Sequence, residues 1–182
     1  MVRFLKGLKT IQQHDDLRIV FVCTANCSRS PLAEILFEKI LVDEVGSRKR
    51  LAEKRIIVES AATHYSGYPI AGRSARVLIE EENIKPDRCS RHRGRQLSEI
   101  DEPSLLLTMT CEHKEDIISM HPLWDTITFT LDEFVKRDKQ LLAKDIEDPM
   151  GGTDEQYRRM KNYIKKDLIL LLIEFREAGL LD

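Results

Sequence analysis

The stretch Arg18–Pro31, which reads RIVFVCTANCSRSP, decides the fold of this chain. Its first part, RIVFV, is rich in β-branched and aromatic side chains, which is typical of a buried strand. A short polar loop then leads to Ser30-Pro31, where a serine N-cap and a proline at the first helical position predict the start of a helix. The apolar residues that follow share one helical face: Leu32, Ile35, Leu36 and Ile40.

Three more β-rich runs follow along the chain, at Arg55–Glu59, Leu105–Met109 and Ile127–Thr130. Helical patterns separate them, and strands joined through helices form parallel sheets that are covered on both faces. The sequence therefore predicts a three-layer, open, doubly wound α/β fold with four parallel strands.

The last helix has the clearest boundaries. Thr153 and Gln156 form a capping box at its start, and Gly179 closes it. Shorter helices are predicted at Ser74–Glu82 and Cys111–Met120. The apolar residues of the last helix recur every three or four positions: Tyr157, Met160, Ile164, Leu168, Leu171 and Phe175.

The length of 182 residues, against about 150 for an average domain, predicts one domain. Residues 1–16 are polar and lack a clear period, so we expect an extension outside the core, followed by a single domain at residues 17–182. The net charge of -2 offers no bulk attraction for nucleic acid or an anionic membrane, so we expect neither as a partner.

The longest apolar run, Leu168–Ile173, is far shorter than the roughly 20 residues that span a membrane. The first residues lack the apolar stretch of an export signal, so we expect a cytoplasmic protein. In that reducing compartment the four cysteines should be thiols. Their spacing disfavours zinc, because no second tight Cys/His pair follows the first two cysteines, Cys23 and Cys27.

The loop after the first strand carries the chemistry. Ligands of open parallel sheets lie beyond the carboxyl ends of the strands. Here a thiol, Cys23, starts such a loop, and Arg29 ends it at a helix amino terminus. Backbone N–H groups of the loop, the helix dipole and the planar guanidinium can together bind a phosphoryl group. The same field favours a thiolate, so Cys23 is a candidate nucleophile. The alternative is a buried structural cysteine.

The sequence from Leu17 to about Phe175 resembles the low-molecular-weight protein tyrosine phosphatases. The loop of that family typically reads Cys-x-Gly-Asn-x-Cys-Arg-Ser-Pro, and this chain has CTANCSRSP. Four further matches follow in order: Ser60–Thr63 (SAAT), His92–Gln96 (HRGRQ), Leu107–Lys114 (LTMTCEHK) and Asp148–Gly152 (DPMGG). The resemblance implies strand order 2-1-3-4 and a phosphatase that needs no cofactor or metal.

The resemblance also implies a role for each matching residue. Cys23 would form a phosphocysteine from a phosphorylated protein, with phosphotyrosine as the first expectation. Arg29 would hold the phosphoryl oxygens, and Asp148 would protonate the leaving oxygen and then activate water. Phosphate and oxyanions such as vanadate would inhibit. The remaining implied site residues are the loop residues Thr24, Ala25, Asn26, Cys27 and Ser28, the pocket wall Tyr65, and the supporting residues Ser30, Ser60 and His92. Ser30 would face the thiolate, and Ser60 and His92 would support Asn26.

Two loop positions depart from the family pattern. Ala25 replaces a glycine, which would strain the backbone by roughly 1 kcal/mol or more if a positive φ is required there. The second cysteine, Cys27, lies one position earlier than usual, which makes a protective disulfide with Cys23 doubtful. Met150-Gly151-Gly152 follows Asp148-Pro149, where tyrosine-selective members often have aromatic residues, so Tyr65 is the nearest candidate for a pocket wall.

Three alternative functions remain open. Some bacterial members of the family dephosphorylate phosphoarginine, and Cys27 does not discriminate between the two substrates. A thiol-dependent arsenate reductase would need a cysteine relay, which looks incomplete with Cys89 and Cys111. A module that only binds phosphorylated partners would need no proton donor.

Overall fold

The computed structural model describes residues 8–9, 11–13, 15–136 and 143–182. Its centre is one sheet of four parallel strands: β1 (Leu17–Cys23), β2 (Ile56–Ala62), β3 (Leu105–Thr108) and β4 (Thr128–Thr130). The strand order is β2-β1-β3-β4, which confirms the predicted fold and order. The first strand is therefore central, and it ends at Cys23.

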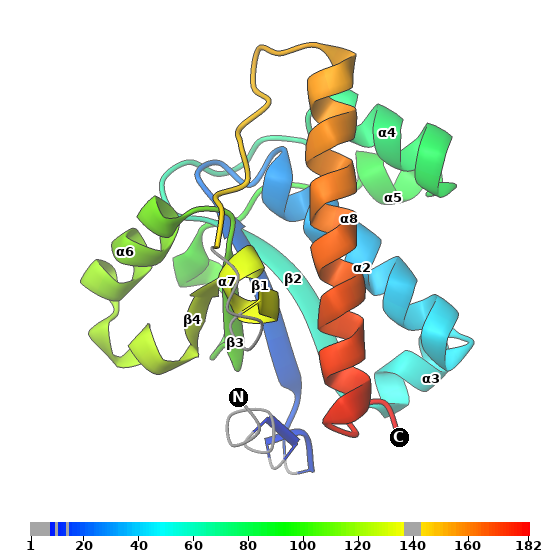
Figure 1. Cartoon of the computed structure of the whole chain (residues 1–182), viewed down its shortest axis with the longest axis vertical. Helices are drawn as coiled ribbons and strands as arrows, with labels where there is room; N and C mark the ends of the chain where they lie inside the picture. Colours follow the sequence, from blue (N-terminus) through cyan, green and yellow to red (C-terminus); the bar gives the residue numbers. More distant parts are fainter. Residues whose placement is uncertain (1–7, 10, 14, 137–142) are drawn as a thin grey trace.

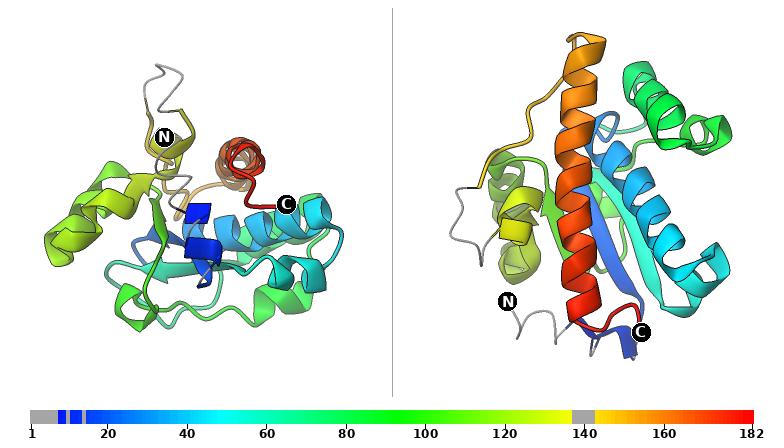
Figure 2. Two further views of the ribbon diagram at one scale, coloured as in Figure 1. Left: turned by 90° about the horizontal axis from the view of Figure 1, so that it is seen from below. Right: turned by 45° about the vertical axis from the view of Figure 1, so that its right-hand side comes forward.

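One face of the sheet is covered by two long helices, α2 (Arg29–Val45) and α8 (Asp154–Glu177), which lie side by side in Figures 1 and 2. Side chains of α7 (Leu131–Lys136) join the same core. Its largest aromatic contact stacks Phe21, Phe37 and Phe175 edge to face, with ring centroids 5.9 and 5.7 Å apart. This core fixes the direction in which α2 leaves the Cys23–Arg29 loop.

The other face carries a smaller core. Val20 and Val22 of β1 pack there with Leu106 and with Ile117 of α6 (Cys111–Met120). The 3-10 turns η1 (Leu97–Glu99) and η2 (Pro122–Ile127) complete this side. Both faces of the sheet are thus covered, as the parallel strands require.

Short helices fill the remaining connections. These are α3 (Arg48–Glu53), α4 (Gly72–Glu82) and α5 (Pro86–Ser90), of which the sequence predicted only most of α4. The helices predicted at Cys111–Met120 and after Thr153 are confirmed, including the capping box of Thr153 with Gln156. Among the described residues, none of the helices is long and apolar enough to cross a membrane.

Two local predictions are wrong. Helix α2 begins at Arg29, and its N-cap position is Ser28, so Ser30 is not the cap and its hydroxyl is used elsewhere. Leu8, which was expected outside the core, is only 2% exposed and packs within it. Gln12 Nε2 also donates hydrogen bonds to the carbonyl oxygens of Leu180 and Lys54, which ties this segment to the domain.

Candidate active site

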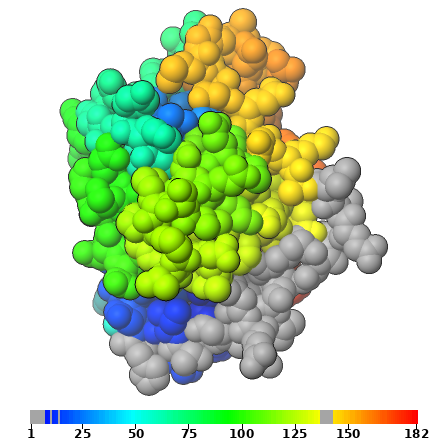
Figure 3. Space-filling view, turned by 90° about the vertical axis from the view of Figure 1, so that its left-hand side faces the viewer, coloured from blue at the N-terminus to red at the C-terminus, as the bar shows by residue number. Residues whose placement is uncertain are grey.

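The Cys23–Arg29 loop connects the end of the central strand to the start of α2. In Figure 3 a small part of the blue segment that contains it emerges between the teal segment after β2, the green segment of α6 and the orange segment before α8. Cys23, Asn26 and Arg29 are all at most 5% exposed. The loop therefore lies at the base of the region where these segments meet.

The carbonyl groups of the loop point outward, toward the segments that surround it. Four of them accept backbone or side-chain hydrogen bonds of 2.6 to 3.2 Å. The pairs of carbonyl and donor residue are Cys23 with Thr63, Thr24 with His64 and Tyr65, Asn26 with His92, and Cys27 with Ala71.

The N–H groups of the same loop remain available. Among the residues that the structure describes, those of Thr24, Ala25 and Asn26 donate no hydrogen bond to another group. Consecutive backbone N–H groups without protein partners form a cradle for an anion. The loop is therefore built to bind an oxyanion next to the thiol of Cys23.

Asn26 holds the loop in shape. Its φ of 49° is left-handed, a conformation that asparagine tolerates better than most residues. Its Nδ2 donates to Ser30 Oγ (2.9 Å), and its Oδ1 accepts from the backbone N–H of Arg95 (3.1 Å). His92 Nε2 lies 2.8 Å from the Asn26 carbonyl oxygen and must be the donor, because a carbonyl only accepts. His92 and Asn26 are thus in contact, as the resemblance implied.

Ser30 connects the side chain of Asn26 to the thiol of Cys23. Its Oγ lies 3.0 Å from Cys23 Sγ. Since the same oxygen accepts from Asn26, its own proton is free to point toward the sulfur, with the Ala61 carbonyl as a more distant acceptor at 3.5 Å. A hydroxyl that donates to the sulfur stabilises its anionic form.

Ser60 has a different partner from the one expected. Its hydroxyl donates to Glu34 Oε2, which belongs to α2, rather than to Asn26. Glu34 is also paired with Arg88 at 2.6 Å. The strand register orients Ser60 toward α2, so it supports the helix that follows the loop instead of the loop itself.

Arg29 and Asp148 meet at the opening of the loop. Arg29 Nη2 donates to Asp148 Oδ2 at 2.6 Å, and Nη1 donates to the carbonyl oxygen of Ile146 at 3.3 Å. The backbone N–H of Met150 donates to Asp148 Oδ1 (3.0 Å), which orients the carboxyl group. The fold thus brings together a cysteine, an arginine and a carboxylate that are up to 125 positions apart.

His113 of α6 is a further site residue, which the sequence alone did not predict. Its Nε2 lies 2.8 Å from Thr24 Oγ1, and its Nδ1 lies 2.8 Å from Thr110 Oγ1. Burial, with the nearby charge of Arg29, lowers the pKa of His113 to about 4. The ring is therefore neutral and connects the loop to the N-cap of α6. The only sequence signal was its position within the LTMTCEHK match.

The two unusual loop residues are accommodated. Ala25 does not have a positive φ, so the expected strain is absent and its methyl group fits. Cys27 is a free thiol, and burial together with the charges of Cys23 and Asp148 raises its pKa. Cys27 therefore stays protonated next to the reactive cysteine. Ser28 Oγ is 3.0 Å from Ser74 Oγ of α4, which attaches the end of the loop to that helix.

The rim of the site is open and partly apolar. Tyr65, whose backbone N–H donates to the Thr24 carbonyl, is 62% exposed, and Met150 is 66% exposed.

The other cysteines lie away from this centre or have other contacts. Cys89 is buried in the core, and Cys111 Sγ is 3.7 Å from Glu115. Burial and Glu115 raise the pKa of Cys111, which makes it a weak nucleophile. Among the described residues, no group of three or more Cys, His, Asp or Glu side chains is placed to hold a metal ion.

Comparison with known proteins agrees with this geometry. Residues 18–179 match the family model described as low molecular weight phosphotyrosine protein phosphatase. The chain is 34% identical over 145 residues to the low molecular weight protein-tyrosine-phosphatase PtpB of Staphylococcus haemolyticus, with 79% of this chain and 88% of PtpB covered.

Two further relatives are similar in sequence or structure. A protein-arginine-phosphatase of Geobacillus stearothermophilus is 33% identical over 150 residues, covering 81% of this chain and 88% of that protein. The crystal structure of a low molecular weight protein tyrosine phosphatase from T. tengcongensis superposes with a TM-score of 0.72 at 29% identity, over 86% of this chain and 98% of the other.

Proposed function

This chain is a member of the low molecular weight phosphotyrosine protein phosphatase family, and we propose that it removes phosphate from tyrosine side chains of proteins through Cys23. The observation that supports this most strongly is the Cys23–Arg29 loop, in which the N–H groups of Thr24, Ala25 and Asn26 donate to no other group in the described part of the chain. That arrangement suits a phosphoryl group whose charge grows in the transition state.

In the first step Cys23 Sγ attacks phosphorus, the bond between phosphorus and the tyrosine oxygen breaks, and Asp148 gives its proton to that oxygen. Arg29 exchanges its contact with Asp148, 2.6 Å in this structure, for the phosphoryl oxygens. The exchange releases the carboxyl group to face the leaving oxygen. In the second step Asp148 takes a proton from water, the water oxygen bonds to phosphorus, and the sulfur–phosphorus bond breaks.

The experiment compares wild-type protein with Cys23→Ser and Asp148→Ala on two esters that differ in the acidity of the leaving phenol. Cys23→Ser should have no measurable turnover but still bind vanadate, because the loop amides and Arg29 remain. Asp148→Ala should lower kcat/KM about a hundredfold on phenyl phosphate, and much less on dinitrophenyl phosphate, whose leaving group needs no proton. Turnover by Cys23→Ser, or equal losses on both esters in Asp148→Ala, would contradict these roles.

Phosphoarginine in proteins is a second candidate substrate. The similarity to the protein-arginine-phosphatase of Geobacillus stearothermophilus favours it. The open rim at Tyr65 and Met150 would admit either side chain. Values of kcat/KM on matched phosphotyrosine and phosphoarginine peptides, with Cys23→Ser as the blank, decide between them.

The four free thiols suit the reducing cytoplasm, where we place this activity.

A further inference from the structure

The segment that carries Asp148 is held by single hydrogen bonds along its length. Asp145 Oδ1 accepts from the backbone N–H of Cys111 at 2.8 Å, and the N–H of Ile146 donates to the Met109 carbonyl at 2.9 Å. These two bonds fix the middle of the segment to the end of β3 and the start of α6. The part of the segment closer to α7 takes no part in these two bonds, so other contacts must hold it.

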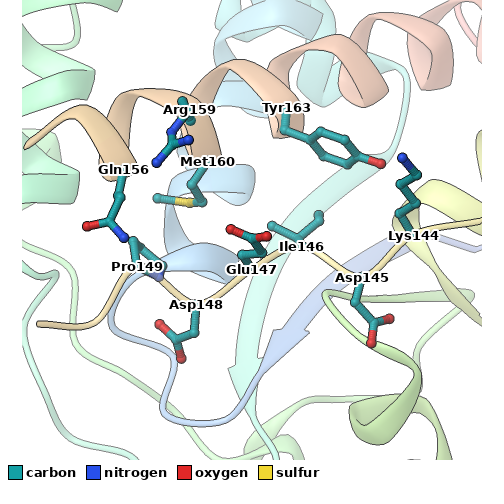
Figure 4. Close-up of a pocket in the computed structure, with 10 residues that line it drawn as sticks. All are labelled: Lys144, Asp145, Ile146, Glu147, Asp148, Pro149, Gln156, Arg159, Met160 and Tyr163. Atoms are coloured by element: carbon teal, nitrogen blue, oxygen red, sulfur yellow. The ribbon is translucent and has the colours of Figure 1, made fainter. Parts of the chain in front are cut away.

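On the side that faces α8, the segment borders a cavity. A cavity of about 300 Å³ lies between residues 144–149 and α8. Figure 4 shows Glu147 pointing toward Met160 across this space, while Asp148 and Asp145 point the opposite way. Ile146 is buried in the core, but Lys144, Glu147 and Asp148 are exposed, so hydrogen bonds rather than packing hold these three residues.

At the start of the segment, Asp132 is the hydrogen-bond acceptor. Its Oδ2 accepts from the backbone N–H of Lys144 at 2.7 Å. Asp132 lies in the first turn of α7 and is 1% exposed, although nothing in the proposed chemistry uses it. Burial of a carboxylate costs free energy unless the group is fully paired, so the presence of Asp132 in the core calls for a reason.

The pairing of Asp132 is extensive. Oδ1 accepts from Tyr163 Oη at 2.6 Å and is ion-paired with Lys136. Burial opposes ionisation of Asp132, but these bonds and that of the Lys144 N–H hold its pKa below the usual value. Asp132 is thus a charged group held rigidly between α7 and α8.

A second buried carboxyl group, Asp167 of α8, lies behind Asp132. It is 1% exposed and its Oδ2 has no hydrogen-bond partner among the described residues. Burial and the charge of Asp132 raise the pKa of Asp167 to about 7, while Lys136 and Lys166 oppose that shift. Asp167 is therefore largely protonated below neutral pH and donates to Asp132 without competing for its cations.

We infer that Asp132 is a positioning residue for the proton donor: it fixes the backbone of Lys144, and through the segment 144–148 it sets the place of Asp148 at the opening of the Cys23–Arg29 loop. The inference rests on the proposed role of Asp148 as the acid. Catalysis is sensitive to such placement, because a shift of about 1 Å can cost a large factor in rate.

The test uses Asp132→Asn in the full chain, with Asp167→Asn as the matched control. Asparagine at 132 keeps the shape but has a single acceptor oxygen, so it cannot serve both the backbone N–H of Lys144 and the pair Lys136 and Tyr163. We expect kcat/KM on phenyl phosphate to fall about tenfold more than on dinitrophenyl phosphate, because only the first ester needs the proton. Vanadate affinity should stay within about twofold, since the loop is untouched. Asp167→Asn imitates the protonated carboxyl group. It should change neither the ratio of kcat/KM between the two esters nor the affinity for vanadate.

Equal losses on the two esters, or a loss that accompanies weaker vanadate binding, would overturn the inference, because both indicate general damage. If Asp132→Asn does not fold, Tyr163→Phe removes one donor to Asp132 and should change the ester ratio in the same direction by a smaller factor; an unchanged ratio in that folded variant also overturns it. Asp148→Ala, measured alongside, tests the proposed function separately: its own ester ratio must change whatever Asp132 does.

Discussion

At the residue scale, the left-handed backbone of Asn26 explains how the loop tolerates Ala25. The turn that would demand a glycine at position 25 is made one residue later, where φ is 49°. Asparagine pays little for this conformation, and its side chain then bonds to Ser30 and to Arg95. One residue thus provides both the turn and the clamp.

Gly94 matters for the same loop through the side chain that it lacks. A Cβ there would lie 3.2 Å from the Asn26 carbonyl oxygen and 3.3 Å from that of Ala25. We predict that Gly94→Ala displaces the loop and weakens vanadate binding and kcat/KM by about tenfold. Vanadate inhibition and steady-state kinetics with p-nitrophenyl phosphate measure both effects.

Gly72→Ala is the control for that substitution. A Cβ at Gly72 would meet no atom within 4 Å, so the same added methyl group should change neither quantity. Equal effects of the two variants on vanadate binding and kcat/KM would show that the close approach of Gly94 does not position the loop.

At the element scale, the capping box of α8 connects the segment bearing Asp148 to a long helix. Thr153 Oγ1 accepts from the N–H of Gln156 at 3.4 Å, and Gln156 Oε1 accepts from the N–H of Thr153 at 2.7 Å. We predict that Thr153→Ala lowers the free energy of unfolding by about 1 kcal/mol, as measured in urea, because one N–H loses its partner. Thr153→Ser keeps the hydroxyl and should lose much less; an equal loss would mean that the methyl group matters instead.

The short helices show where local pattern stops being informative. Helix α7 spans only Leu131–Lys136, too few residues for a helical period to stand out. Thr130 and Glu133 have the spacing of a capping box and bond to each other, but without a helical period after it that spacing alone does not mark a helix. The helix is held by tertiary contacts of Leu131 and Phe134 in the core, and not by intrinsic propensity.

At the scale of the whole molecule, Asp167 makes stability depend on pH. Its folded pKa of about 7 lies above the value of 3.8 expected in the unfolded chain. Between these values the unfolded state has released a proton that the folded state retains, so this group lowers stability as pH rises from about 4 to about 7. His113, whose folded pKa of about 4 lies below the usual 6.5, acts in the opposite direction between those two values.

We therefore predict that Asp167→Asn removes a destabilising slope of at most about 1.4 kcal/mol per pH unit. Urea unfolding of wild type and variant at several pH values measures the difference, in which the contribution of His113 cancels. The variant should gain stability relative to wild type as pH rises toward 7 and then stay level. A difference that does not vary with pH would show that Asp167 ionises normally in the folded protein.

The sequence by itself determined the parallel α/β fold, the place of Cys23 at the end of the first strand, the capped last helix, and Cys23 with Arg29 as a pair. These depend on local periodicity, on caps and on a loop of seven residues, Cys23 to Arg29, all of which are written in neighbouring positions. Asp148 could be identified only through the resemblance of the chain to a known family, because an Asp-Pro pair is also common in ordinary turns.

The tertiary structure alone decided the partner of Ser60, the burial of Leu8, and the parts played by His113, Gly94 and Asp132. Each depends on contacts between residues far apart in the chain: His113 reaches Thr24 across 89 positions, and Gly94 approaches the loop from a segment that follows β2, α4 and α5. Such contacts depend on the packing of whole elements, because neither the burial of a side chain nor its hydrogen-bond partner is a property of its neighbours in sequence.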